Sequence, residues 1–226
     1  MGKFINYHSD NKLEFYSKIY EDVYSSNKNY GAIRSNRLKD SHYPGMFKYC
    51  INPSKIKFDS VLDIGCGPGV GLNYMAKDLG KKVCGIDPST SAILKAKEKG
   101  YKCSVASATK IPYEDNSFDL VMSTDVIEHL RPEDQEEAHR ECFRVSKKYI
   151  AHKIANTLEG NKFGKQQLHL TCWEHDKWLN FFHNLNLKWN LIYYITPHIF
   201  DNILGKKKND YKLWKYHNTC VVFEKV

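Results

Sequence analysis

The heptapeptide DIGCGPG at residues 63–69 constrains the fold of this chain more than any other stretch. Residues 60–65 before it form an apolar run, and residues 72–79 after it carry apolar side chains at helical spacing, so we expect a strand, a tight turn and a helix. Alternate glycines let the backbone turn sharply and approach a ligand closely, because no Cβ is in the way. The pattern favours a parallel sheet with helices on its faces.

The same alternation of strands and helices continues to residue 153, and two β-rich runs follow near the C-terminus. We therefore predict an α/β fold: a doubly wound, mostly parallel, seven-stranded sheet of Rossmann-like type, with an antiparallel C-terminal strand. The predicted strands are 60–65, 82–87, 102–106, 118–123, 149–153, 189–196 and 218–226, and the predicted helices lie near 70–80, 89–100 and after Pro132.

Amino-acid composition divides the chain into two parts. Residues 1–57, rich in Tyr, Asn, Lys and Ser, are expected to form a helical N-terminal cap on the acceptor side, and residues 58–226 a single domain. No run approaches the roughly 20 apolar residues that span a bilayer, and the first residues lack the apolar core of a signal peptide. We expect a cytoplasmic protein whose seven cysteines, none in a C-x-x-C pair, are reduced thiols.

The formal net charge is +8, from 34 basic and 26 acidic side chains. This excess favours an anionic partner such as a nucleotide, a nucleic acid or an anionic surface, although a lysine-rich composition also simply maintains solubility. The basic residues are spread along the chain rather than concentrated, which favours a small anionic or polyhydroxylated molecule over nucleic acid.

The spacing around the glycine turn discriminates between nucleotide-binding chemistries. Asp87 lies about 20 residues after the turn, at the end of the second predicted strand, where a carboxylate can accept hydrogen bonds from ribose hydroxyls. A phosphate-binding P-loop would end in Gly-Lys-Ser/Thr, which is absent here. A dinucleotide-binding turn would read G-x-G-x-x-G/A, but Val70 occupies the last of those positions.

Three stretches together resemble the first, second and fourth motifs of the class I S-adenosylmethionine-dependent methyltransferases. They are VLDIGCGPG at 61–69, GIDPS at 85–89 and SATKIPYEDNSFDLVMSTDVIEHL at 107–130. They occur in the family's order, and the resemblance covers roughly residues 58–150.

The resemblance implies that S-adenosylmethionine is the methyl donor and assigns it a set of residues. The glycine turn would pass under the methionine part, Asp87 would hold the ribose, and Ser107 would lie beside the adenine, where most relatives carry an aspartate. Ser123 and Thr124 would line the cleft in which the methyl group is transferred. The implied donor-binding residues are Asp63, Gly65, Cys66, Gly67, Gly69, Asp87, Ser107, Ala108 and Thr124.

The segment 125–129 (DVIEH) suggests a metal site. If it is helical, Asp125, Glu128 and His129 share one face. This acid-x-x-Glu-His arrangement resembles the metal-binding segment of the ubiquinone-pathway O-methyltransferases and of the enzymes that 2′-O-methylate small RNAs at their 3′ ends. In the latter a later histidine completes the set, and His169 is the candidate here.

Such ligands suit Mg²⁺, Mn²⁺ or Fe²⁺. The alternative is that the Glu-His pair serves packing and hydrogen bonding without a metal, as in many family members. A second spacing, His169-x-x-Cys172-x-x-His175, offers one thiolate only and is a poor zinc site.

Transfer to a hydroxyl requires removal of its proton. A neutral His169 or His129 is the candidate general base, and a bound divalent cation that lowers the pKa of the acceptor is the other possibility. The sequence leaves both open.

We expect O-methylation of a small hydroxylated or phosphorylated metabolite, such as a sugar or nucleotide-sugar. The segment 167–171 (QLHLT) is similar to segments of bacterial methyltransferases associated with surface sugars. The alternatives are a metal-dependent RNA 2′-O-methyltransferase and a catalytically inactive, donor-binding regulatory protein, to which Ser107 points. The aromatic and basic candidates for acceptor contacts are Tyr16, Tyr20, Tyr24, Tyr30, Arg34, Arg37, His42, Tyr43, Trp173 and Trp178.

Overall fold

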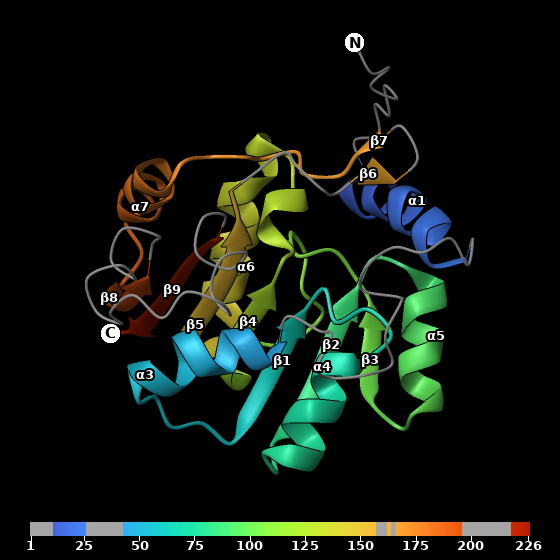
Figure 1. Cartoon of the computed structure of the whole chain (residues 1–226), viewed down its shortest axis with the longest axis horizontal. Coiled ribbons are helices and arrows are strands. Elements are labelled where there is room, and N and C mark those ends of the chain that lie inside the picture. The colour runs from blue at the N-terminus through green and yellow to red at the C-terminus, as the bar shows by residue number, and fades with distance from the viewer. Residues whose placement is uncertain (1–10, 26–42, 157–161, 164–165, 196–217) are drawn as a thin grey trace, which may run out of the picture.

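The computed structural model describes residues 11–25, 43–156, 162–163, 166–195 and 218–226. Its centre is a seven-stranded sheet with the strand order β3-β2-β1-β4-β5-β9-β8 (Figure 1). The strands are β1 (Ser60–Ile64), β2 (Lys82–Asp87), β3 (Lys102–Val105), β4 (Phe118–Thr124), β5 (Ser146–Ala155), β8 (Trp189–Ile195) and β9 (Asn218–Lys225).

Strands β3, β2, β1, β4 and β5 run parallel, whereas β9 is antiparallel to both β5 and β8. The predicted doubly wound sheet with an antiparallel C-terminal strand is therefore confirmed. Because the parallel strands all point the same way, the segments that follow β1, β2 and β4 meet at one edge of the sheet, where ligands bind in open α/β sheets.

The helices that connect the parallel strands are those the periodicity predicts. In the described part of the chain, α4 (Val70–Asn73) continues as the π-helical turn η3 (Tyr74–Asp78), α5 spans Thr90–Glu98 and α6 spans Gln135–Val145. The hydroxyl of Ser89 accepts a hydrogen bond from the amide of Ala92 at 3.1 Å and caps α5, as a serine before a helix does.

Two apolar cores lie on opposite faces of the sheet, because successive side chains of a strand point to opposite faces. Leu62 of β1 packs in the core that contains Ala138 of α6, while its neighbour Val61 packs in the core that contains Leu72 of α4. Both faces are covered, which explains why the strands read as apolar runs rather than alternating ones.

The N-terminal part is helical where it is described. Helix α1 (Lys12–Ser25) packs against α5, and residues 43–54 form the short consecutive helices α2 (Tyr43–Met46), η2 (Phe47–Ile51) and α3 (Asn52–Ser54) (Figure 1). The division into a cap and a domain at residue 57 stays a prediction.

The remaining elements are the short 3₁₀ turns η4 (Ile127–His129) and η5 (Pro132–Asp134), the small strand pair β6 (Lys162–Phe163) and β7 (Gln166–Gln167), and helix α7 (His175–Asn184). None of the helices in the described ranges combines the length and apolarity needed to traverse a lipid bilayer.

Candidate active site

The glycine turn follows β1 and has a left-handed backbone at three positions. The φ angles are +70° at Gly65, +52° at Gly67 and +80° at Gly69, a region that other residues rarely adopt. The amides of Gly65 and Cys66 both donate to the carbonyl of Ile86, at 2.8 and 3.0 Å, and so fasten the turn to the end of β2.

Space as well as conformation requires glycine here. A Cβ on Gly65 would lie 2.4 Å from Cγ2 of Val126, and a Cβ on Gly67 would lie 2.9 Å from the hydroxyl of Tyr24 in α1. The turn is thus enclosed between the segment after β4 and the N-terminal helix.

Asp87 is held where a ribose-binding acid is expected. Its Oδ2 accepts the amide of Gly67 at 3.0 Å and its Oδ1 accepts the amide of Ser89 at 2.9 Å, which positions the carboxylate between the turn and α5. Burial raises its pKa to about 6, while the two amide hydrogen bonds oppose that rise. Each carboxylate oxygen retains acceptor capacity for a hydroxyl.

Asp63, the acid that precedes the turn, is fully buried on the opposite side of β1 from Leu62. Its Oδ2 accepts the hydroxyl of Tyr43 at 2.7 Å, and its Oδ1 has no hydrogen-bond partner in the described part of the molecule. Burial raises the pKa of Asp63 to about 8. Tyr43, whose ring also packs against Gly71, is a partner that sequence reasoning did not connect with this acid.

The other implied donor contacts lie in the loops after β3 and β4. Ser107 and Ala108 are buried just beyond β3, and the Ser107 hydroxyl is 2.9 Å from that of Thr109. Thr124 ends β4, and its buried Oγ1 has no hydrogen-bond partner among the described residues. Ser123 does not face this edge: it is fully buried and its hydroxyl lies 2.8 Å from Nδ1 of His152 on the α6 side of the sheet.

The expectation that Asp125 shares a helical face with Glu128 and His129 is not met. Asp125 has a left-handed φ of +54° and precedes η4, so the segment is not a regular helix. Its carboxylate forms an ion pair with Lys153, which is 1% exposed, and its amide donates to the Lys153 carbonyl at 2.9 Å. The sequence feature that could have indicated this pair is Lys153 itself, a lysine in the largely apolar C-terminal half of β5.

Glu128, His129 and His169 do come together, as predicted. One possible ligand atom from each lies within 4.8 Å of the others, and all three side chains are buried. The contact forms because the Glu128 carbonyl accepts the amides of Leu170 and Thr171, both at 2.9 Å, which pins the segment containing His169 over η4.

The protonation of this cluster follows from its burial. Burial and the neighbouring His169 lower the pKa of His129 to about 3, so its imidazole is neutral at physiological pH. Its Nδ1 donates to the Leu168 carbonyl at 3.1 Å, which leaves Nε2 as an acceptor. Burial, and next the charge of Asp125, raise the pKa of Glu128 to about 8.

Glu128 Oε1 accepts the Ala155 amide at 3.1 Å and lies 3.9 Å from Nε2 of His169. Its Oε2 is buried with no hydrogen-bond partner in the described ranges.

The zinc-like spacing of His169, Cys172 and His175 does not assemble a site in the described chain. His175 contacts Thr219 and Asn156 instead, and Cys172 points its thiol at the carbonyl of His169.

The aromatic acceptor candidates divide by location. The ring of Tyr20 meets His129 edge-on with 5.9 Å between centroids, and Tyr24 covers Gly67. Trp173 and Trp178 instead belong to an aromatic cluster at α7, in which the Trp173 ring meets Trp178 and Phe181. Tyr30, Arg34, Arg37 and His42 lie outside the described residues.

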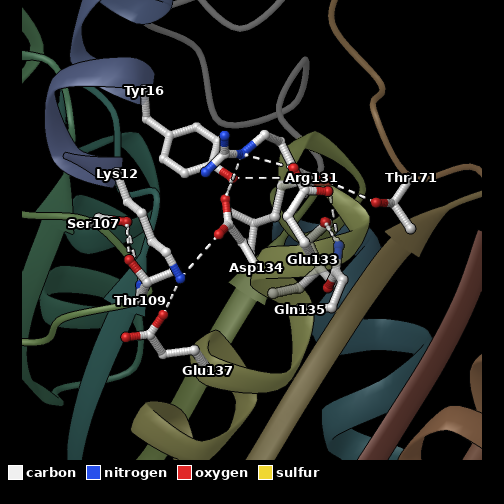
Figure 2. A network of polar contacts seen from close by, with 12 residues as sticks. Lys12, Tyr16, Ser107, Thr109, Arg131, Glu133, Asp134, Gln135, Glu137 and Thr171 are labelled. Atoms are coloured by element: carbon white, nitrogen blue, oxygen red, sulfur yellow. Dashed lines mark hydrogen bonds and ion pairs between the residues drawn. The ribbon is translucent and has the colours of Figure 1, made fainter. Parts of the chain in front are cut away.

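A polar network fixes α1 over this edge of the sheet (Figure 2). At its centre, the buried Asp134 accepts the hydroxyl of Tyr16 at 2.5 Å and Nε of Arg131 at 2.8 Å, and its other oxygen is 3.0 Å from Nζ of Lys12. Farther along α1, Glu21 accepts hydrogen bonds from Ser89 and Ser91 at the start of α5. Nothing in the sequence spacing indicates these long-range contacts.

The strand order, the glycine turn after β1 and the acid at the end of β2 define a Rossmann-like fold of the class I methyltransferase type. Residues 62–149 match the family model described as methyltransferase domain. The chain thus carries a class I S-adenosylmethionine-dependent methyltransferase domain, as the sequence motifs indicate.

The matching segments of relatives agree with this assignment. The chain is 47% identical over 77 residues to phosphoethanolamine N-methyltransferase 3 of Arabidopsis thaliana, covering 31% of this chain and 16% of that protein. It is 38% identical over 103 residues to norajmaline N-methyltransferase of Rauvolfia serpentina, covering 42% and 34%. The chain therefore matches well under two thirds of the length of these curated relatives.

A solved protein from Pyrococcus horikoshii shares the fold with a TM-score of 0.64 and 19% identity, over 91% of this chain and 99% of that one.

Proposed function

We propose that this protein is an S-adenosylmethionine-dependent methyltransferase that acts on a hydroxyl group of a small metabolite, such as a sugar or nucleotide-sugar. The observation that carries the proposal is a neutral, buried imidazole, His129, at the same edge of the sheet as the glycine turn and Asp87.

The donor-side residues fit the group that the motifs imply. Gly65, Gly67 and Gly69 provide a turn without side chains, Asp87 retains acceptor capacity for ribose hydroxyls, and Thr124 has a buried oxygen lacking a partner in the described chain. When bound, the sulfonium supplies an activated methyl group, so the protein's task is alignment and proton removal.

His129 is our candidate for accepting the proton. Its Nδ1–H is fixed by the Leu168 carbonyl, which leaves Nε2 as the proton acceptor. Its low pKa keeps it unprotonated at neutral pH but makes it a weak base, so it would accept the proton as methyl transfer makes the hydroxyl more acidic. His169, with its ring centroid 4.7 Å from that of His129, is the second candidate base. Tyr20 of α1, at the edge of the His129 ring, would border the acceptor.

A divalent cation is an alternative means of deprotonation. Glu128, His129 and His169 supply a carboxylate and two imidazoles, a ligand set found in catalytic metal sites. Oε2 of Glu128, which has no hydrogen-bond partner among the described residues, suits this role. Such an ion would lower the pKa of a hydroxyl bound to it. Asp125, committed to Lys153, would not complete the set in this conformation.

The second candidate is methylation of an amine, supported by the relatives, which are named for phosphoethanolamine and norajmaline N-methylation. The similarity to the phosphoethanolamine enzyme spans 77 residues, so it does not transfer the acceptor. An ammonium acceptor also needs to lose a proton, and His129 could receive it equally well.

An acceptor screen tests these proposals. Consumption of the donor would be measured with sugars, nucleotide-sugars, phosphoethanolamine and a short RNA, each with and without a chelator. We expect turnover with a hydroxylated small molecule that falls at least about 100-fold in His129→Ala, the usual range for loss of a general base. His183→Ala, which changes an exposed histidine of α7, is the control.

Each outcome of this screen distinguishes one candidate function from the others. Turnover only with phosphoethanolamine would replace the hydroxyl acceptor by an amine, and turnover only with RNA, with steep salt dependence, would favour the RNA enzyme. Loss of activity with the chelator would identify the metal route. Donor binding without turnover on any acceptor would indicate a regulatory protein.

A further inference from the structure

Two cysteines meet beneath the glycine turn, although they lie 37 positions apart in the sequence. The side chain of Cys66, in the turn, lies over Gly85 of β2: a Cβ on Gly85 would be 2.5 Å from the Cys66 sulfur and 2.7 Å from its Cβ. Cys103 of β3 is the register partner of Gly85 in the parallel β2–β3 pair. Because register partners on adjacent strands present side chains to the same face, about 4.8 Å apart, Cys66 lies next to Cys103.

The two thiols belong to one buried cluster on this face of the sheet, and the Cys66 thiol donates to the Gly67 carbonyl at 3.6 Å. The neighbouring Cys66 thiol, with the amide of Gly85 and the charge of Lys97, lowers the pKa of the Cys103 thiol despite its burial. The neighbouring Cys103 thiol and burial raise the pKa of Cys66 well above its usual value. The pair therefore consists of one thiol with increased thiolate character and one neutral neighbour, the arrangement of an attacking and a resolving cysteine.

We propose that Cys66 and Cys103 form an oxidisable dithiol, which a hydroperoxide converts to a disulfide that ties the glycine turn to β3. The Cys103 thiolate attacks the peroxide, the O–O bond breaks, and sulfenic acid forms on Cys103 with release of water or an alcohol. The Cys66 sulfur then attacks the Cys103 sulfur, the S–O bond breaks and a water leaves. Two thiols are oxidised and one hydroperoxide is reduced.

The disulfide would alter the donor site. It brings the two sulfurs to about 2.05 Å from one another, and because Cys66 lies between Gly65 and Gly67, the backbone of the turn moves with it. The Gly67 amide also positions Asp87, so the displacement reaches the carboxylate as well. This last step rests on the proposed donor-binding function, whereas the formation of the disulfide does not.

A second thiol pair provides a natural comparison. Cys50 of η2 lies near Cys220 of β9 in the same buried cluster, and both residues are 0% exposed, whereas Cys66 and Cys103 are 3% and 6% exposed. In addition, β3 is an edge strand of the sheet and β9 is interior. A small peroxide should therefore reach the first pair before the second.

The experiment treats the full chain with hydrogen peroxide and measures three quantities: free thiols, the linked peptides by mass spectrometry, and donor affinity by calorimetry. We expect a Cys66–Cys103 disulfide, loss of two of the seven thiols, and an approximately tenfold fall in donor affinity that dithiothreitol reverses. Cys103→Ser should form no such disulfide and keep its affinity under peroxide, whereas Cys50→Ser should behave like the unaltered chain. Circular dichroism checks that both variants fold. If Cys103→Ser does not fold, Cys103→Ala replaces it.

Peroxide treatment that leaves Cys66 and Cys103 unlinked, or that links Cys50 to Cys220 first, would overturn the proposal. A disulfide at the expected position with unchanged donor affinity would overturn the effect on the site. If the reduced protein binds no donor, the proposed function fails, while peptide mapping still decides whether the dithiol is oxidised.

Discussion

Two buried aspartates at the glycine turn differ in how readily they ionise, and their hydrogen-bond partners differ too. Asp87 accepts two backbone amides and has a pKa of about 6, so it is ionised at pH 7.5. Asp63 accepts a single tyrosine hydroxyl, and burial raises its pKa to about 8, so its carboxylate form is less favoured than that of Asp87. Hydrogen bonds from backbone amides stabilise the ionised form of a carboxyl group. Asp87, which has two of them, is therefore the better acceptor for ribose hydroxyls.

Asp87→Asn tests this role. We expect donor affinity to fall about tenfold to hundredfold, because charge-assisted hydrogen bonds are lost, and isothermal titration calorimetry measures it. In the unaltered protein, affinity should also fall as the pH drops below about 6, where Asp87 becomes protonated.

Asp119→Asn is a matched control. Asp119 also accepts two backbone amides, those of Asp59 and Ser60, but it lies on β4 near its start, at the opposite edge of the sheet. Its replacement should cost stability without changing donor affinity. Equal losses of affinity in the two variants would contradict a ribose contact for Asp87.

At the scale of elements, one buried acid joins α1 to the segment after β4. Asp134 joins Lys12 and Tyr16 of α1 to Arg131 at the start of η5 (Figure 2). Burial of Tyr16 and its hydrogen bond to Asp134 raise the pKa of the phenol far above its usual value, so Tyr16 remains a donor at any physiological pH. The contact therefore does not depend on pH in that range.

Asp134→Ala should lower the free energy of unfolding by about 2 kcal/mol, because a buried donor and two partly exposed cations lose their acceptor. Urea unfolding followed by circular dichroism measures the change. Glu133→Ala is the control: Glu133 is 64% exposed and 3.4 Å from Arg131, so its loss should cost little. Comparable losses in both variants would show that Asp134 does not anchor α1.

At the scale of the whole molecule, two histidines couple stability to pH. His139 of α6 and His152 of β5 are fully buried with 5.0 Å between ring centroids. Burial lowers the pKa of His139 to about 4, and burial together with His139 lowers that of His152 well below its usual value. Both are neutral in the folded protein at pH 7.

At these two sites the folded state therefore binds fewer protons than the unfolded chain between about pH 6.5 and pH 4. The contribution of these histidines to stability is fully present above about pH 6.5 and is lost as the pH falls through that window, by about 3 kcal/mol for His139 alone at its lower end. Urea unfolding at a series of pH values measures the slope. The slope of the unfolding free energy against pH should decrease in His139→Gln. It should persist in His183→Gln, because His183 is exposed in the unaltered protein. An unchanged slope in His139→Gln would refute the assignment.

Local patterns of the sequence were sufficient for the sheet and for the donor turn. Strand and helix periods locate the parallel strands, and the glycines with Asp87 locate the turn, because these signals depend on neighbours within one element or one β-α-β unit. The pairing of Glu128 and His129 with His169 came from a family resemblance, and the carbonyl of Glu128 is the contact that brings them together.

Other features depended on contacts between distant segments. Asp125 departs from the expected ligand set because Lys153, on the adjacent strand, neutralises it. Ser123 faces His152 rather than the cleft because strand alternation places it on the α6 face.

The sequence by itself determined the class of fold and the edge of the sheet at which chemistry occurs, since strand and helix periods and turn geometry follow from local conformational preferences. Only the tertiary structure decided which acids are ionised, that α1 closes over Gly67, and that Cys66 meets Cys103. The physical reason is that the burial, ionisation and contacts of a side chain depend on the residues that surround it. Those residues come from segments that are far apart in the chain.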